Sequence, residues 1–202
     1  EPAANVQSLM LALERDQAGG LLDTVRSGAT TSGQVSWYAF AALIGDGSDL
    51  ARLAEVLPGV DPGDDRYGVG LALTARAALR HGHDELAEWV RPRLARLGTR
   101  VVILGFGTVV LGPASLFLGH AHLQLGQLDE AAAAFAAAEA VARRAGAPTW
   151  LAEARLWRAR VLVEQGDPVS TDALLDETTV EPQWARLVAL RNDVAAARVA
   201  RV

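Results

Sequence analysis

The four histidines form two close pairs, and they are the residues whose type and spacing most resemble a metal site. His120 and His122 lie in a stretch with helical periodicity, where side chains two residues apart point about 200° from one another and cannot chelate one ion. His81 and His83 flank a turn glycine and can approach each other, but the sequence suggests no third ligand nearby. Turn and partner-facing roles are therefore favoured, and we expect no bound metal and no other cofactor.

The sequence lacks the motifs of the common enzyme classes. All 19 basic residues are arginines, so no lysine is present to build a phosphate-binding P-loop, and without cysteine there is neither a thiolate zinc site nor a cysteine nucleophile. Gly105, Gly107 and Gly112 do not form a dinucleotide-binding fingerprint. The acidic stretches 45–50 and 61–65 lack the closing glutamate of a calcium loop. We therefore expect that the chain is not an enzyme.

Charge and hydropathy argue against nucleic acid and membranes as partners. The formal net charge of −5 opposes broad nonspecific binding to nucleic acid. The basic stretch 91–100 is better explained by the dipole at a helix end. The best apolar candidate for a membrane span, 101–112, is too short for a bilayer and contains three glycines. We expect a cytoplasmic location and no direct nucleic-acid binding by this segment.

The alanine-rich stretch 118–148 gives the strongest structural signal. Asp129 and Glu130 lie in the first turn of the predicted helix and Arg143 and Arg144 in its last turn, the placement that the helix dipole favours. Gly146 and Pro148 then end the helix. Upstream, a second apolar stripe runs to Gly126, so the two helices form an antiparallel hairpin. The apolar positions that define the helical stripe are Leu128, Ala131, Ala132, Phe135, Ala138, Val141 and Ala142.

The same helix–turn–helix unit recurs along the chain. Turn glycines at positions 47, 82, 126 and 166 lie 35, 44 and 40 residues apart, an irregular period in the range of helical-hairpin repeats. We predict an all-α fold: a helical-hairpin solenoid, or α-α superhelix, of about five hairpins plus a closing helix over 182–201. The whole chain, 1–202, forms a single repeat domain, with 97–113 as an irregular, partly buried connector or an extended segment laid against the array.

One unit resembles a tetratricopeptide repeat. The pattern L-G-x(6)-G-x-x-x-E-A-x-x-x-F-x-x-A is filled by Leu118, Gly119, Gly126, Glu130, Ala131, Phe135 and Ala138. Other units depart from it: Arg91 stands where the unit 67–97 should carry an aromatic residue, and Thr171 replaces a small alanine in the unit 149–177. The resemblance implies a fold of the tetratricopeptide type.

A longer segment, 89–163, resembles the C-terminal repeat region of large actinobacterial regulators. These are ATPase-containing LuxR- or MalT-like transcriptional activators and related cyclase-linked proteins. The shared marks are VVILGFG, LGP and AGAPTWLAEARLWRARVL. The resemblance implies a sensory or protein-binding module. Because the chain begins with Glu1, we expect it to be a piece of a larger protein whose ATPase, cyclase and DNA-binding parts lie outside these 202 residues.

Aligning the turn glycines places seven residues on the first helices, which line the concave groove of such repeats. A row of Arg, His and Arg at one position would favour an acidic or carboxylate-terminated partner. The alternative is that these side chains are solvated, or paired with Glu153, Glu164 or a neighbour. The groove candidates are Trp37, facing inward; Arg76, His120 and Arg160 at one equivalent position; and Arg80, Gln124 and Glu164 at a second.

These observations lead to an expected function. The chain is an interaction and sensing module of a bacterial transcriptional regulator, and its groove binds a protein or peptide partner or another domain of its own chain. The alternative is a small-molecule effector domain with an apolar pocket between the groove and segment 101–112. An enzyme with an unrecognised constellation of residues ranks third.

Overall fold

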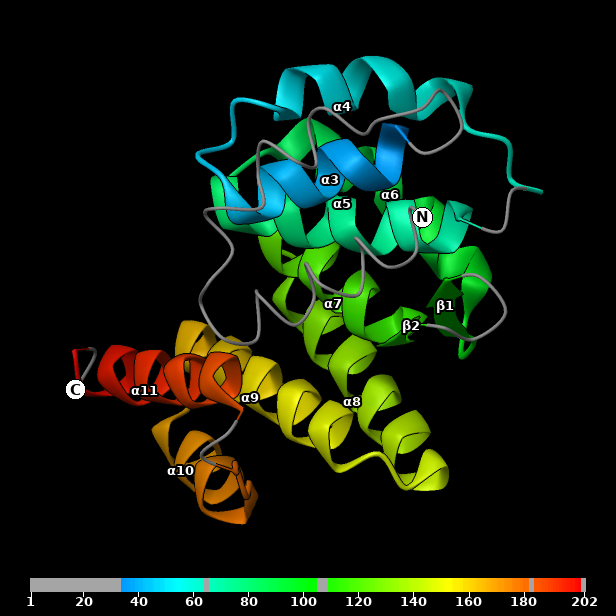
Figure 1. Cartoon of the computed structure of the whole chain (residues 1–202). Helices are drawn as coiled ribbons and strands as arrows, with labels where there is room; N and C mark the ends of the chain where they lie inside the picture. Colours follow the sequence, from blue (N-terminus) through cyan, green and yellow to red (C-terminus); the bar gives the residue numbers. More distant parts are fainter. Residues whose placement is uncertain (1–33, 64–65, 105–108, 182–183, 201–202) are drawn as a thin grey trace.

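The computed structural model describes residues 34–63, 66–104, 109–181 and 184–200, which form an all-α fold of helical hairpins, as predicted (Figure 1). The first of the five predicted hairpins falls on residues 1–33, outside the described residues, and the superhelix stays a prediction. The described hairpins are α3 (Gln34–Ile44) with α4 (Leu50–Val56), α5 (Tyr67–His81) with α6 (Asp84–Leu97), α7 (Ala114–Gln124) with α8 (Leu128–Ala145), and α9 (Pro148–Gln165) with α10 (Pro168–Glu177), followed by α11 (Ala185–Val199).

Local signals in the sequence set the helix ends. Helix α8 carries acids in its first turn and arginines in its last, and it ends at Gly146, whose φ of 62° is left-handed. The side chain of Asp167 caps α10 by accepting a hydrogen bond from the Ser170 amide at 3.0 Å. His83 caps α6 in the same way, through the Leu86 amide at 3.4 Å. The hairpin turns are therefore encoded by short-range chemistry.

The helices do not stack with one regular contact pattern. Helix α5 packs against α3, α6 and α7, and α7 packs against α5, α6 and α8. Helix α9 instead packs mainly on α8, α10 and α11, which lies alongside α9 at the C-terminal end (Figure 1). The backbones of α7 and α9 consequently stay apart, and side chains bridge the space between them.

The buried apolar residues divide in the same way. One cluster runs from α3 to α8 and includes Ala154 and Val161 of α9. A second, smaller cluster is formed by α9, α10 and α11, with Leu156 and Leu187 at its centre. Alanine and leucine dominate both clusters, and small side chains let helices approach closely.

The connector 97–113 is more regular than the irregular segment predicted. Strands β1 (Val101–Leu104) and β2 (Val109–Pro113) pair antiparallel, with an irregularity between Val102 and Ile103. Val102 is buried, whereas Ile103 faces outward. The sequence indicated an extended, partly buried segment, but the pairing with itself was missed because its glycines obscure the strand pattern. In the described ranges, no helix has both the length and the apolar character to cross a membrane.

Helices α7 and α8 pack closely at Gly119. A Cβ atom added there would lie 2.5 Å from Cε1 and 2.6 Å from Cδ1 of Phe135, whose ring is fully buried. The ring has no solvent-filled space into which it could move, so this position requires glycine.

We predict that Gly119→Ala lowers the free energy of unfolding by about 1–3 kcal/mol, because the added methyl group overpacks this contact. Urea unfolding followed by circular dichroism measures the change. The control is Gly59→Ala in the 3-10 turn Leu57–Gly59, where an added Cβ meets no atom within 4 Å. The control should shift stability by less than about 1 kcal/mol; equal effects of the two variants would contradict the close approach.

Candidate ligand-binding site

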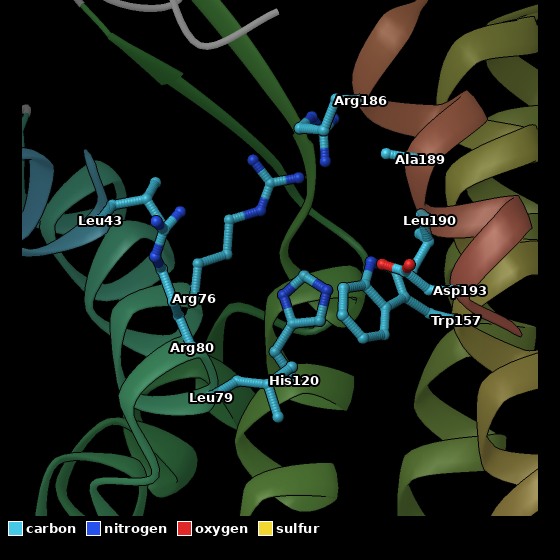
Figure 2. A pocket seen from close by; sticks show the side chains of 10 residues that line it. All are labelled: Leu43, Arg76, Leu79, Arg80, His120, Trp157, Arg186, Ala189, Leu190 and Asp193. Atoms are coloured by element: carbon cyan, nitrogen blue, oxygen red, sulfur yellow. The ribbon is translucent and has the colours of Figure 1, made fainter. Parts of the chain in front are cut away.

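A hollow of about 410 Å³, the inner pocket, opens between the α5–α7 side of the array and α11 (Figure 2). A second hollow of about 520 Å³, the adjoining pocket, shares part of this lining. The inner pocket is lined by Leu43, Arg76, Leu79, Arg80, His120, Trp157, Arg186, Ala189, Leu190 and Asp193. The adjoining pocket is lined by Leu79, Leu123, Gly126, Leu128, Trp157, Arg160, Glu164, Leu190, Asp193 and Val194.

Helical periodicity brings these side chains to one place. On α5, Arg76, Leu79 and Arg80 follow the i, i+3, i+4 spacing of a single helix face. On α11, Arg186 and Asp193 lie two turns apart on the face that also carries the apolar lining. The two faces oppose one another, and His120 and Trp157 lie between them (Figure 2). The hollow is therefore framed by rigid helices.

A buried carboxylate ties three of these helices together. Glu153 of α9 has a side chain only 3% exposed, and Arg186 of α11 donates to both of its oxygens, at 2.7 Å (Nη1–Oε1) and 3.0 Å (Nη2–Oε2). Arg76 of α5 also donates to Oε1. Burial alone would raise the pKa of Glu153, but the attraction of Arg186 and Arg76 outweighs it and holds this pKa far below its usual range. Glu153 is therefore ionised at neutral pH.

His120 lies at the base of the inner pocket within a cluster of aromatic rings. Its ring centroid is 4.8 Å from that of Trp157, 5.6 Å from Phe135 and 6.0 Å from Phe117, each in an edge arrangement. The imidazole is fully buried, and neither ring nitrogen has a hydrogen-bond partner among the described residues; the same holds for Trp157 Nε1. Burial, reinforced by the nearby charge of Arg76, lowers the pKa of His120 to about 3. The ring is therefore neutral at pH 7.

The inner pocket has a small excess of positive charge. Arg76, Arg80 and Arg186 contribute three guanidinium groups, while the nearby carboxylates are Glu153, which Arg76 and Arg186 bind, and the exposed Asp193 of the lining. Arg76 also lies over the Phe117 ring, with 5.3 Å between Cζ and the ring centroid. Most of the remaining wall is leucine, alanine and tryptophan. Apolar walls with a few convergent charges are typical of small-ligand sites.

Five of the seven groove candidates line the two pockets. Arg76, Arg80 and His120 line the inner pocket, and Arg160 and Glu164 line the adjoining one. Two of these side chains are also paired within the chain, as the alternative prediction had it. Arg76 binds Glu153, and Arg160 binds Glu164 at 2.8 Å.

The other two candidates lie elsewhere. The Gln124 side chain donates to Asp84 Oδ1 at 2.6 Å, which links α7 to α6, and it lines neither pocket. Trp37 is on α3, but its side chain is outside the described residues. Neither pocket contains a described residue of 101–112, where the effector-domain hypothesis placed its pocket.

Sequence reasoning missed the contribution of α11. Arg186, Leu190 and Asp193 come from the closing helix, which the turn-glycine register does not cover. Their spacing along α11 could have indicated a second lining face. Trp157, which the register did not single out, packs against His120 and also lines both pockets.

The remaining histidines have structural contacts. A ring nitrogen of His81, Nε2, lies 2.6 Å from the Ala42 carbonyl oxygen and links α5 to α3. His83 caps α6, and His122 Nδ1 lies 2.7 Å from the side-chain oxygen of Gln127. Within the part of the chain that the structure describes, no three His, Cys, Asp or Glu side chains are grouped so that they could hold a metal ion.

Comparisons of the chain with protein-family models, with curated protein sequences and with solved structures return no match. The sequence resemblance to tetratricopeptide repeats and to LuxR- or MalT-like regulators therefore stays a prediction.

We predict that Glu153→Gln lowers the free energy of unfolding by about 2–4 kcal/mol at pH 7, because Arg76 and Arg186 lose their shared carboxylate. The control Glu164→Gln removes a partly exposed i,i+4 pair and should cost less than about 0.5 kcal/mol. Since the pKa of Glu153 is depressed, its contribution is present above the unfolded-state pKa and declines as the pH falls below it. Urea unfolding at several pH values measures both effects; equal costs for the two variants would contradict the role of Glu153.

The neutral His120 predicts a second pH effect. Its folded-state pKa of about 3 lies below the ordinary 6.5, so the unfolded chain takes up a proton that the folded chain excludes. The contribution of the neutral His120 to the free energy of unfolding is fully present above about pH 6.5. It falls by at most about 1.4 kcal/mol per pH unit as the pH decreases to about 3.

The variant His120→Gln lacks the histidine whose titration causes this pH dependence. Between pH 6.5 and 4.5 the free energy of unfolding of the wild type should therefore fall by about 2–3 kcal/mol more than that of the variant. Urea unfolding of both proteins across this range provides the measurement. Parallel pH profiles would show that His120 titrates normally in the folded chain.

Proposed function

We propose that this chain is a binding and sensing module that takes a small anionic effector in the inner pocket. The observation that carries the proposal is that Arg76, Arg80 and Arg186 together line a largely apolar hollow of about 410 Å³. Hollows of roughly 300–1,000 Å³ are the usual size for small-molecule sites. Guanidinium groups bind carboxylates and phosphates through paired, charge-assisted hydrogen bonds.

The chemistry of the lining favours binding over catalysis. A general base works best with a pKa near the operating pH, whereas the pKa of His120 is about 3. The Glu153 carboxylate is already bound by two guanidinium groups. These residues suit fixed recognition of a ligand, with no group poised to move a proton at neutral pH.

The sequence resemblance of residues 89–163 supports a context for this module. We place it in a larger bacterial transcriptional regulator of the LuxR- or MalT-like type, in the cytoplasm, where effector binding would be transmitted to neighbouring domains. Helix α11 would transmit the binding event, because it contributes Arg186 and Leu190 to the inner pocket and is the last helix that the structure describes.

A second candidate is binding of a peptide segment, from a partner protein or from another part of the same chain. The adjoining pocket favours it, because the lining continues past Trp157 along α7 and α9 and could hold several residues of an extended chain. A peptide would occupy the adjoining pocket as well as the inner one, whereas a small effector needs only the inner pocket. Binding measurements with both kinds of ligand distinguish the two candidates.

We predict that a small organic anion raises the melting temperature of the chain. A panel of monocarboxylates, phosphate monoesters and short acidic peptides is tested by differential scanning fluorimetry. A ligand present at 100 times its Kd stabilises the folded state by about 2.7 kcal/mol, or about 5–10 °C for a chain of this size. A response to acidic peptides alone would favour the second candidate.

The matched variants are Arg80→Gln and Arg144→Gln. Arg80 is exposed at the pocket mouth, while Arg144 is exposed on the outer helix α8, so neither replacement disturbs the core. We expect Arg80→Gln to weaken binding about five- to tenfold, because a charged hydrogen-bond donor is lost, and Arg144→Gln to leave it unchanged. Equal affinities of the two variants, or no response to any anion, would contradict the proposed site.

A further inference from the structure

The two pockets are neighbours with different chemistry. They share Leu79, Trp157, Leu190 and Asp193, so one ligand can extend from the first hollow into the second. The excess positive charge is confined to the inner pocket, where Arg76, Arg80 and Arg186 lie. An extended ligand would therefore meet a net positive charge only at the end that lies in the inner pocket, because Arg160 of the adjoining pocket is paired with Glu164.

The adjoining pocket offers mainly hydrocarbon surface. Besides Asp193, which it shares with the inner pocket, its lining has two oppositely charged groups, Arg160 and Glu164, which neutralise each other at 2.8 Å. The apolar part of its lining comes from α5, α7, α8, α9 and α11 and consists of Leu79, Leu123, Leu128, Trp157, Leu190 and Val194. This composition suits an uncharged, apolar part of a ligand.

Unpaired polar atoms lie where the two pockets meet. His120 is fully buried in the base of the inner pocket with both ring nitrogens unpartnered among the described residues, and the indole Nε1 of Trp157 is in the same condition. Buried polar atoms normally find a hydrogen-bond partner. Figure 2 shows the His120 and Trp157 rings together between the arginines and Asp193. An oxygen-bearing ligand group that reaches this base, after a small movement of Trp157, would accept hydrogen bonds from the indole N–H and from the one protonated nitrogen of the neutral imidazole.

We propose that the ligand is an amphipathic monocarboxylic acid, with its carboxylate at Arg80 and Arg186 and its linear hydrocarbon tail running past Trp157 into the adjoining pocket. This inference rests on the proposed function and names the ligand class. One negative charge fits better than two, because Arg76 and Arg186 already share the Glu153 carboxylate and Asp193 adds a second negative charge to the lining, which leaves a net charge of about +1 from the three arginines. The carboxylate oxygens are also acceptors for the Trp157 indole N–H.

The test is isothermal titration calorimetry of the complete 202-residue chain with butyrate, hexanoate, octanoate and decanoate. Each methylene buried in the adjoining pocket should tighten binding about fourfold, until the pocket is filled. The matching primary alcohols, which have the same tails without the charge, should bind at least about tenfold more weakly.

Two variants test the binding of the carboxylate and the binding of the hydrocarbon tail separately. Arg80→Gln should weaken binding of all four acids by a similar factor, since it alters only the charged end. Leu123→Asn, in the adjoining pocket, should leave butyrate binding intact and remove the gain from hexanoate to decanoate. Retained butyrate binding also shows that this variant is folded. Val169→Asn, at an exposed position on α10, is the matched control and should retain the full dependence on chain length.

The outcomes distinguish this inference from the function on which it rests. If butyrate binds but longer acids bind no more tightly, the tail site is wrong while the anion pocket stands. If no carboxylic acid binds but a phosphate ester or acidic peptide does, the monocarboxylate is wrong and the binding module again stands. If no anion binds at all, both proposals fail.

Discussion

The contact between α5, α9 and α11 depends on the buried carboxylate of Glu153. Glu153 takes hydrogen bonds from Arg76 and Arg186 and thereby fixes α5, α9 and α11 relative to each other. Desolvating a carboxylate is costly, and only the two guanidinium groups make its burial tolerable. Because α9 packs on α8 and its backbone stays apart from α7, this ionic contact is a main direct link between the early hairpins and the closing helix.

The same arrangement explains why a hollow is present. Side chains, not close backbone contacts, span the space between α7 and α9: the rings of His120, Phe135 and Trp157 fill its base, and the arginines stand at its mouth. A neutral His120 suits this position, since a second charge beside Arg76 would be repelled. Structural stability and the proposed ligand recognition therefore depend on the same few side chains.

Much of the fold could be predicted from local sequence signals. Helix α8, with its charged ends and Gly146, and the turn histidine His83 are determined by residues within a few positions of each other. The turn-glycine register also brought Arg76 and His120 to one surface. What it could not provide is long-range geometry: the choice of Glu153 as the shared partner depends on contacts between helices far apart in the sequence. The lining role of α11 was missed for the same reason. The self-pairing of the segment 101–113 is local and was missed because its glycines obscure the strand pattern.

The most direct measurement of the central claim is the indole N–H resonance of Trp157 in a ¹⁵N-labelled chain titrated with octanoate. Trp157 lines both pockets and its Nε1 is unpartnered among the described residues, so this resonance should shift progressively with ligand and saturate at one equivalent. An unchanged Trp157 resonance, with shifts instead at the exposed Ile103 and Val110 of the β-hairpin, would show that the ligand binds elsewhere and would contradict the account.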